Sequence, residues 1–450
     1  MSTSAIARYH EALQDRAIAQ ASAEVLDRQL RHDGLFFGER PLCSVLRPRF
    51  LSLGQYKQLA AACALVGSAF EKVRVAAMAD SALRAQFGLT AWEEQLIHAA
   101  PGFDVASPTS RLDAFFAEGE GGLKFTEYNA ETPAGAAYND ALSRAFLSLP
   151  VMHEFSRTHI AVPLPAAPSV VHVLLNAYYR WRGVREAPTV CILDWTEVPT
   201  YSEFVLFERE FRALGIDAFI GDPRDAEYID GRLLIGGRHV TLIYKRVLID
   251  ELVSRAGVDS PVIRAVREGA VCMVNPLRCK MLHKKASLAV LSDERQAPLL
   301  SAEERAAVSA HIPWTRVVEA RHTQHGASRV DLLEFTAANR ASLVLKPNDE
   351  YGGKGIVLGW TVDDATWAAA IQTALGEPYI VQERVVVPSE PWPEWSGGAL
   401  HIGDRMLDTA PFLADGVTMS GCLTRIATDP LLNVTAGGGS NVPTFLVEAR

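Results

Sequence analysis

The chain has 450 residues, of which 48% are hydrophobic and 22% are charged, as in an ordinary globular protein. This length predicts two or three lobes rather than one small core. Lysine and arginine number 44 against 53 aspartate and glutamate residues, a net charge of −9, which argues against nucleic-acid binding through bulk positive charge.

The six cysteines are scattered without a CxxC pair, and several lie in apolar runs, which is typical of reduced, buried thiols in a cytosolic protein. Charged residues interrupt the first twenty positions, so these positions lack the apolar core of a secretory signal. No apolar run approaches the ~18 residues that would cross a bilayer. We therefore expect a cytoplasmic protein with no membrane partner.

The first hundred residues are expected to be mainly helical, because alanine, leucine and glutamate recur there at helical spacing. Pro101 and Gly102 end this pattern. Residues 123–129 then predict a strand that runs into a turn at Pro133–Gly135.

Three prolines within residues 160–168 predict a connector. Residues 169–275 alternate short apolar strands with helical segments, which predicts an α/β lobe with a largely parallel sheet. Residues 290–340 have a helical, charged pattern, and strands dominate from Leu343 onward. The prolines around Trp392 predict a stiff surface loop or a loop that faces a substrate.

The segment Leu343–Gly355, LVLKPNDEYGGKG, joins an apolar strand that contains Lys346 to a glycine-rich turn. A lysine supplies a point charge for phosphate oxygens, and glycines let backbone N–H groups approach those oxygens closely. The segment is neither a Walker A loop nor a dinucleotide-binding fingerprint, because it matches neither GxxxxGK(S/T) nor GxGxxG. It predicts either a triphosphate-binding loop or a glycine-rich hairpin with surface lysines.

Two other segments could bind the same nucleotide. On a predicted strand at 379–383, Gln382 and Glu383 suit the nucleoside, because a strand edge and a carboxylate can hydrogen-bond adenine or ribose. The alternative is an exposed glutamate on a strand. The segment NPLRCK is expected to open a helix with Lys280 and Lys284 on one face, which predicts either a phosphate contact or a solvated basic helix.

The polar residues of the predicted strand at 123–129 form the third cluster. Glu127 and Asn129 are two positions apart, so both side chains point to one face, and Arg111 and Asp113 upstream have the same spacing. Two carboxylates and an amide oxygen suit Mg²⁺, which completes its shell with phosphates and water. An arginine beside them suits charge developing on a transferred phosphoryl group. The alternative is a structural pair of polar strands.

Together these clusters resemble the ATP-grasp superfamily, and specifically its circularly permuted branch, which includes the synthetase domain of glutathionylspermidine synthases. In the usual ATP-grasp chain the nucleotide lysines come first and the metal ligands last. Here the set from Arg111 to Asn129 precedes Lys280 and Lys346. Glu127 and Asn129, followed by a proline and a glycine, are similar to the metal strand of the branch.

The remaining motifs follow the same branch. The segment NPLxxK resembles its first nucleotide lysine, and VLKPxxxxGGKG resembles its second lysine and flexible loop. The run from Arg425 through Asn433 to Gly439 is similar to its arginine and glycine-rich tail. By motif order the resemblance covers about residues 100–450.

The resemblance implies an α/β fold of the circularly permuted ATP-grasp type. Its three regions would be a helical N-terminal region with the metal-binding strand at 1–165, an α/β domain like the one that precedes the ATP-grasp domain at 166–290, and a nucleotide-binding domain at 291–450. The active site would lie between lobes, so that Asp113 and Lys346 would converge on one nucleotide.

The resemblance also implies an enzyme, an ATP-dependent carboxylate–amine ligase that forms an amide bond through an acyl phosphate and releases ADP and phosphate. The implied cofactors are ATP and Mg²⁺, and the implied partners are a small-molecule carboxylate and an amine, such as an amino acid, a peptide or a polyamine. The implied residues are Asp113, Glu127 and Asn129 for the metal, Lys280, Lys346, Gly352, Gly353, Lys354, Gly355, Gln382 and Glu383 for the nucleotide, and Arg111 and Arg425 for catalysis.

Two other functions remain open, a nucleotide-binding protein without ligase activity and an ATP-dependent phosphotransferase. ATP turnover that needs both a carboxylate and an amine would separate the ligase from both. A zinc site at His322 and His325 lacks a third ligand nearby, and a hydrolase triad is not supported because the chain has no GxSxG. The sequence does not identify the two substrates or the oligomeric state.

Overall fold

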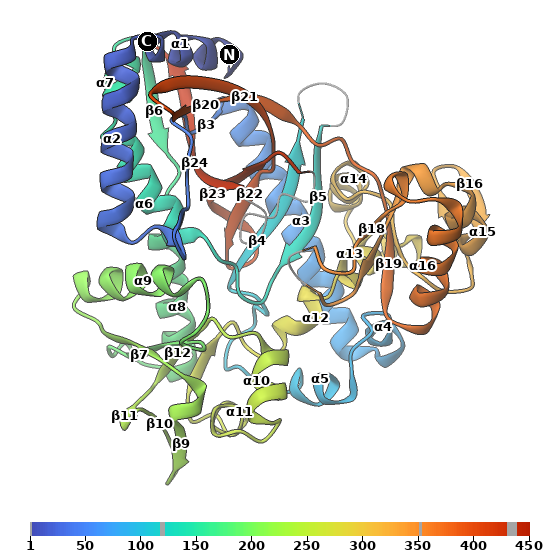
Figure 1. The fold of residues 1–450 in the computed structure, drawn as a ribbon. Helices are drawn as coiled ribbons and strands as arrows, with labels where there is room; N and C mark the ends of the chain where they lie inside the picture. Colours follow the sequence, from blue (N-terminus) through green and yellow to red (C-terminus); the bar gives the residue numbers. More distant parts are fainter. Residues whose placement is uncertain (1, 118–121, 351–352, 430–438) are drawn as a thin grey trace.

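A computed structural model describes residues 2–117, 122–350, 353–429 and 439–450. Its framework consists of one large mixed sheet, a four-stranded parallel sheet and a four-stranded antiparallel sheet, with helices packed between and around them (Figure 1). The predicted α/β class is therefore confirmed. The circular permutation and the domain boundaries at 165 and 290 stay predictions.

The large sheet joins strands from both ends of the described chain. Its order is β20-β21-β23-β22-β4-β5, and β24 pairs with β23, β3 and β6. The strands are β3 (Arg49–Leu51), β4 (Thr109–Phe116), β5 (Leu123–Asn129), β6 (His159–Pro163), β20 (Ser389–Ser396), β21 (Ala399–Leu407), β22 (Ala410–Ala414), β23 (Thr418–Ala427) and β24 (Ser440–Ala449). This pairing brings the predicted metal strand β5 into one sheet with the strand that carries Arg425.

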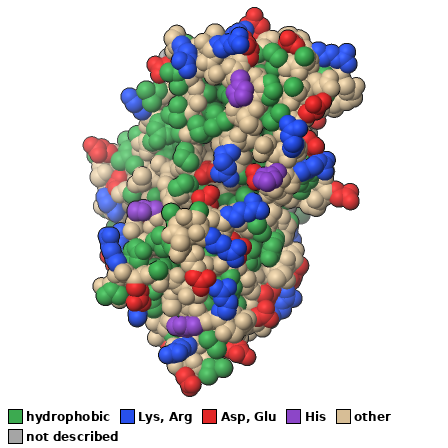
Figure 2. Space-filling model, turned by 90° about the vertical axis from the view of Figure 1, so that its left-hand side faces the viewer, with side chains coloured by type: hydrophobic (Ala, Val, Ile, Leu, Met, Phe, Trp, Pro, Cys, Tyr) green, Lys and Arg blue, Asp and Glu red, His purple; other side chains and the backbone are tan. Residues whose placement is uncertain are grey.

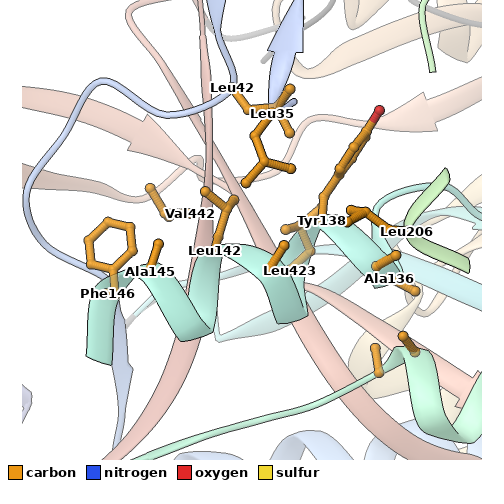
Figure 3. Packing of buried hydrophobic residues seen from close by; sticks show 14 of the residues in the cluster. Leu35, Leu42, Ala136, Tyr138, Leu142, Ala145, Phe146, Leu206, Leu423 and Val442 are labelled. Carbon is orange, nitrogen blue, oxygen red and sulfur yellow. The ribbon is translucent and has the colours of Figure 1, made fainter. Parts of the chain in front are cut away.

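Two hydrophobic cores lie on opposite faces of the large sheet. Along β23, Cys422 contributes to one core and Leu423 to the other, as the two-residue period of a strand requires. One core packs against α1 (Ser2–Leu13), α2 (Arg16–Asp33), α6 (Ala136–Leu147), α7 (Pro150–Phe155) and α8 (Ala167–Arg182), and the other against α3 (Leu53–Ala79), α13 (Ala286–Leu291) and α14 (Ala302–His311). Figure 3 shows the first core, where α6 packs beside Leu35, Leu42 and Val442.

The predicted parallel sheet is confirmed. Its order is β13-β12-β7-β8, and every neighbouring pair is parallel. It contains β7 (Thr189–Leu193), β8 (Asp217–Gly221), β12 (Leu242–Lys245) and β13 (Cys272–Val274), with α9 (Tyr201–Ala213), α10 (Ile249–Ala256) and α11 (Pro261–Arg267) and a small sheet of β9 (Ala226–Ile229), β10 (Arg232–Ile235) and β11 (Arg238–His239). The carboxyl ends of β12 and β13 face the segment between β5 and α6, which lines the cavity described below.

The antiparallel sheet belongs to the C-terminal part of the chain. Its order is β14-β19-β17-β18. It contains β14 (Thr315–Val317), β17 (Leu343–Pro347), β18 (Val357–Leu358) and β19 (Tyr379–Glu383), and α15 (Leu332–Ala338) and α16 (Asp364–Gly376) pack on it. Because Leu343 and Leu345 of β17 belong to this core, the side chain of the next residue, Lys346, is directed to the other face of the sheet.

The prediction that residues 290–340 are helical is wrong only for residues 315–331, which lie between α14 and α15. The chain there forms β14 and a hairpin of β15 (His322–His325) and β16 (Ser328–Asp331). These strands are only three or four residues long, and β14 owes its conformation to pairing with β19. A sequence window does not show a partner more than sixty residues away in the chain.

The loop predicted around Trp392 is also wrong. Residues 389–396 form β20, and Trp392 is buried. The strand tolerates Pro391 and Pro393 because β20 is the edge of the large sheet, and its path of paired strands ends there with β21.

The basic helix predicted after Asn275 is shorter than expected. It is α12 (Cys279–His283), which ends before Lys284, and α13 restarts at Ala286. Lys280 and Lys284 are both buried, so the alternative of a solvated basic helix is wrong. The helical pattern at 81–99 is likewise divided into α4 (Ser81–Ala85) and α5 (Ala91–Leu96).

The surface in Figure 2 carries lysine, arginine, aspartate and glutamate side chains in a mixed pattern. Among the described residues, no helix is both long enough and apolar enough to cross a membrane. The short hairpin of β1 (Phe36–Phe37) and β2 (Arg40–Pro41) lies near the start of α6.

Candidate functional site

A cavity of about 1140 Å³ lies where the large sheet, the C-terminal sheet and the start of α6 meet. Nine of the predicted site residues line it: Arg111, Asp113, Glu127, Asn129, Lys346, Gly353, Gln382, Glu383 and Arg425. Lys280, Lys354 and Gly355 are not among the lining residues, and Gly352 lies outside the described residues. The structure therefore gathers side chains from three separate parts of the sequence around one space.

Strand pairing explains why the four residues of β4 and β5 lie together. In the antiparallel pair, Arg111 lies opposite Asn129 and Asp113 lies opposite Glu127. Side chains directly opposite in such a pair have Cβ atoms ~5 Å apart on one face of the sheet. Leu112, between the arginine and the aspartate, points instead into the core beneath the sheet.

Two arginines donate hydrogen bonds to Asp113. Its carboxylate accepts hydrogen bonds from Arg111 Nε at 2.6 Å and from Arg425 Nη2 at 2.6 Å. Burial by itself would raise the pKa of Asp113, but the charges of Arg111 and Arg425 lower it to about 2. The carboxylate is therefore ionised at any physiological pH.

Asp408 is a site residue that the sequence analysis missed. It is buried, lines the cavity just after β21, and accepts a hydrogen bond from Arg425 Nε at 2.6 Å. Burial raises its pKa, and the neighbouring charge of Asp113 adds to that effect. A lone aspartate after a strand gives no sequence signal, because its proximity to Asp113 depends on the order of strands in the sheet.

The donor set fits a hard divalent cation. Asp113, Glu127 and Asn129 offer two carboxylates and one amide on adjacent strands, and Asn129 Nδ2 is buried without a hydrogen-bond partner among the described residues. Within the same residues, no group of three or more His, Cys, Asp or Glu side chains could hold a metal. Protein oxygens alone would thus supply a partial shell, as is usual for Mg²⁺ that also binds phosphate and water.

Lys346 connects the C-terminal sheet to the predicted metal strand. Its ammonium donates to Gln382 Oε1 at 2.8 Å and to the Thr126 carbonyl at 3.3 Å. Burial lowers the pKa of Lys346 to about 8, although Glu127 opposes this shift. A phosphate group beside this lysine would favour its charged form.

Lys285 is a second cation at the site that the sequence analysis did not select. Its ammonium lies 3.1 Å from Glu127 Oε1 and also donates to the Glu350 carbonyl at 2.5 Å. Lys285 precedes α13 directly, and its charge lowers the pKa of Glu127, whose burial would raise it. The basic run at 280–285 was the available signal, but the prediction named Lys280 and not Lys285, and neither lysine is among the lining residues.

Lys280 instead belongs to a buried ionic network. Its ammonium lies 2.9 Å from Asp349, 3.4 Å from Asp250 and 3.5 Å from Glu131, and Lys284 also lies 2.8 Å from Asp349. These carboxylates raise the pKa of Lys280 against the opposing effect of burial. Its role in nucleotide binding stays a prediction, because the described contacts are all with protein carboxylates.

The end of the cavity near the C-terminal sheet combines flat and polar groups. The guanidinium of Arg384 lies 4.3 Å from the ring centroid of Trp360, and both residues line the cavity together with Gln382 and Glu383. Flat, partly apolar walls beside strand-edge polar groups suit a planar heterocycle. Trp360 and Arg384 were not selected from the sequence, because they are twenty-four positions apart.

The wall of the cavity at the turn between β5 and α6 is fixed by a buried ion pair of the α/β lobe. Arg246 donates to the Pro133 carbonyl and to Glu203 Oε2, each at 3.0 Å. Glu203 Oε1 accepts from the Gly135 N–H at 2.8 Å and from the Ala137 N–H at 3.2 Å. This buried pair therefore fixes the turn that connects β5 to α6.

His322 and His325 lie on β15, away from the cavity lining. The ring of His325 packs against Trp314 and Phe335.

Chemically, the arrangement concentrates opposite charges around one cavity. Arg111, Arg425, Lys285 and Lys346 supply positive charge, while Asp113, Glu127 and Asp408 supply oxygen ligands. Such a set can neutralise phosphate groups and hold a cation between them.

No family model matches the chain. A Frankia alni protein named "Putative glutamate–cysteine ligase 2-3" is 26% identical over 357 residues, which are 76% of this chain and 39% of that protein. A Frankia casuarinae protein of the same name, numbered 2-2, is 25% identical over 338 residues, 72% of this chain and 36% of that protein. The chain thus spans less than half the length of the curated relatives it matches.

Among solved structures, a glutathione synthetase-like effector from Globodera pallida in its apo form superposes with a TM-score of 0.63 at 12% identity. The match covers 97% of this chain and 99% of that one. The chain therefore has the fold of this glutathione synthetase-like protein over almost its whole length.

Proposed function

We propose that the protein is an ATP-dependent carboxylate–amine ligase of the ATP-grasp type. The observation that carries the proposal is that Asp113, Glu127 and Asn129 share one cavity with Lys346 and with residues of the C-terminal sheet. Oxygen ligands for a cation and a lysine for phosphates are the two requirements of a bound ATP. The names of the two Frankia relatives and the fold shared with a glutathione synthetase-like protein support this choice.

In this proposal, Asp113, Glu127 and Asn129 would hold Mg²⁺, which supplies charge neutralisation for the phosphates. Lys346 and Lys285 would bind phosphate oxygens, and Trp360 with Arg384 would cover the base. Arg111 and Arg425 would bind the substrate carboxylate and the transferring phosphoryl group, because bidentate guanidinium groups suit both anions.

The reaction balances as two displacements. A carboxylate oxygen of the substrate attacks the γ-phosphorus of ATP, the bond from that phosphorus to the bridging oxygen breaks, and ADP leaves. The amine nitrogen then attacks the acyl carbon, loses a proton, and phosphate leaves with the original carboxylate oxygen. The amide keeps the other one.

The test is ATP turnover with pools of carboxylates and amines, followed by isotope transfer. We expect ADP release that needs Mg²⁺, a carboxylate and an amine together. A substrate labelled with ¹⁸O in its carboxylate should deliver one label to the released phosphate. Turnover that proceeds with a hydroxyl acceptor and no carboxylate would favour a phosphotransferase, and nucleotide binding without any turnover would favour a non-catalytic protein.

A further inference from the structure

The cavity continues past the two arginines, away from Lys346. Along β5 the lining passes from Glu127 to Asn129, and then through the turn at Ala134 to Tyr138 on α6. We call this end the far pocket and define it by Phe37, Ala134, Tyr138, Thr200 and Leu423. The nucleotide described above would occupy the opposite end, so the far pocket is left for a substrate.

The five residues of the far pocket include no charged side chain. The hydroxyl of Tyr138 lies 2.8 Å from Ser202 Oγ and 3.3 Å from the Thr200 carbonyl. The phenol oxygen is thus occupied. Figure 3 shows Tyr138 and Leu423 in the same packed region, and both residues line the cavity.

The aromatic wall extends to the N-terminal hairpin. The ring of Phe37 lies edge-on to Tyr138 with centroids 6.2 Å apart. The nearby Arg40 stands 5.8 Å from the Phe37 ring and donates to the Gly439 carbonyl at 2.7 Å. Its charge is therefore engaged beside the ring, and it does not line the cavity.

Two charged residues, Glu203 and Arg246, affect the pKa of Tyr138, but they pair with each other and do not line the cavity. A charged substrate group placed in the far pocket would lose its hydration without gaining a counter-charge there, whereas an apolar group would gain from burial. The far pocket should therefore bind an apolar side group more tightly than a charged one.

We propose that the far pocket receives the uncharged, apolar side group of the carboxylate substrate, whose carboxylate lies against Arg111 and Arg425. The inference rests on the proposed ligase function for the position of the carboxylate. The far pocket would select an apolar α-amino acid or a similar acid over glutamate, lysine or a polyamine. Phe37, Tyr138 and Leu423 would set this specificity.

The first test is calorimetric titration of the full chain saturated with Mg²⁺ and a non-hydrolysable ATP analogue. The probes are L-methionine, L-glutamate and L-lysine, whose side chains are similar in length and differ in charge. We expect methionine to bind at least tenfold more tightly than either of the others. Equal or tighter binding of glutamate or lysine overturns the inference, as does no binding of methionine, leucine or phenylalanine at millimolar concentration.

The second test moves a charge into the pocket. Phe37→Lys should shift the preference at least tenfold from methionine toward glutamate, because the ammonium would supply the missing counter-charge. Phe36→Lys is the matched control, since Phe36 is the neighbouring half-buried residue of β1 and does not line the cavity. If Phe37→Lys unfolds, Thr200→Lys replaces it, and an unchanged preference in a folded variant contradicts the proposal.

Binding preference and turnover are separate readouts, so the two proposals can fail independently. A methionine preference without ADP release would remove the ligase function and leave the selectivity of the pocket. Carboxylate-dependent ADP release that favours glutamate would keep the ligase function and remove the apolar substrate.

Discussion

At the scale of single residues, Lys346 shows how burial prepares a side chain for an anionic ligand. The lysine faces Glu127 and Gln382, while the nearby charge of Lys285 disfavours a second ammonium. Its pKa falls from 10.5 to about 8, and a bound phosphate would restore the charge by Coulombic attraction. Nucleotide binding should therefore take up a proton at alkaline pH.

The first prediction concerns this proton. Between pH 7 and pH 9 the dissociation constant for Mg²⁺-ADP should rise by about tenfold, because a lysine with a pKa of about 8 is mostly neutral at pH 9. Fluorescence or calorimetric titration across that range measures the change. The stability of the ligand-free protein should change in the opposite direction. Between about pH 8 and 10.5 Lys346 binds more protons in the unfolded chain than in the folded protein, so its contribution to the free energy of unfolding increases as the pH rises.

Lys346→Arg provides the control, since a guanidinium stays charged over the whole range. We expect that variant to lose most of the pH dependence while still binding the nucleotide. A wild-type affinity that is flat between pH 7 and pH 9 would mean that Lys346 does not contact the phosphates.

The second prediction concerns Glu127, whose side chain is 31% exposed and pairs with Lys285. Glu127→Gln keeps the size of the side chain but removes the charge that would hold Mg²⁺. We expect ATP turnover to fall by about 100-fold or more, the typical loss when a group that stabilises transition-state charge is removed. The melting temperature without ligand should change little.

A thermal shift separates this effect from misfolding. Wild-type protein at one hundred times the dissociation constant of the nucleotide should gain ~2.7 kcal/mol of stability, and part of that gain should need Mg²⁺. Glu127→Gln should lose the Mg²⁺-dependent part, whereas Glu186→Gln, which removes a half-exposed pairing with Arg182, should keep it. A full Mg²⁺ response in Glu127→Gln would rule out the assigned metal ligand.

At the scale of elements, local periodicity predicted individual strands, and pairing determined the site. The two-residue spacing in β4 and β5 was sufficient to put Arg111, Asp113, Glu127 and Asn129 on one face. The sequence could not place Asp408 beside them, because that contact depends on β21 and β23 lying next to each other. Long-range strand order leaves no signal in a short window.

The sequence also did not show where the helix after Asn275 ends. The pattern at 275–285 suggested one helix with Lys280 and Lys284 on a shared face, but α12 ends at His283. The break turns Lys285 toward Glu127 and leaves Lys280 among buried carboxylates. Charge composition identified the basic run, while the end of α12 decided which lysine contacts Glu127.

The third prediction tests the turn between β5 and α6. Gly135 has φ +102°, and a Cβ atom there would lie 2.6 Å from Leu423 Cδ2. Gly135→Ala should combine backbone strain of ~1–2 kcal/mol with overpacking of ~1–3 kcal/mol. Urea unfolding measures the loss, and substrate affinity should fall because Leu423 belongs to the far pocket and Gly135 also lines the cavity.

Gly183→Ala is the matched control. Gly183 has φ +76° at the end of α8, and no atom in the described part of the chain lies within 4 Å of the position a Cβ atom would take there. That variant should show the strain alone, so Gly135→Ala should be the less stable of the two by about 1–3 kcal/mol. Equal losses of stability in the two variants would show that Leu423 accommodates the added methyl group without a cost in stability.

At the scale of the whole molecule, one buried ionic network joins the parts of the chain that surround the cavity. Glu131 precedes α6, Asp250 lies on α10, and Asp349 follows β17, and all three approach Lys280. The network thus spans the large sheet, the α/β lobe and the C-terminal sheet. The network thus connects the three predicted regions by charge, and the first and third of them also share the large sheet.

Glu131 shows how a carboxylate of this network is paired. Glu131 lies 3.5 Å from both Lys245 and Lys280 and also accepts from the Ile249 N–H. Burial would raise the pKa of Glu131, but the lysines lower it. Breaking a buried pair from one side leaves an uncompensated charge, which costs far more than the pair itself contributes.

The last prediction follows from that asymmetry. Lys280→Met should destabilise the protein by about 3–5 kcal/mol, since Glu131 and Asp349 would each lose one of two lysine partners inside the protein. Lys72→Met is the control, because Lys72 pairs with Glu304 from a position where its side chain is 47% exposed, and such pairs contribute ~1 kcal/mol or less. Chemical denaturation measures both.

Nucleotide affinity measured on the folded Lys280→Met variant separates the two roles that this lysine could have. If Lys280 acts through the network, the dissociation constant for Mg²⁺-ADP should stay within about threefold of the wild type, while Lys346→Ala loses tenfold or more. If Lys280 binds phosphate, as the resemblance to the permuted ATP-grasp branch implies, both variants should lose affinity alike. The comparison therefore determines whether the NPLxxK segment stabilises the junction of the lobes or contacts the ligand.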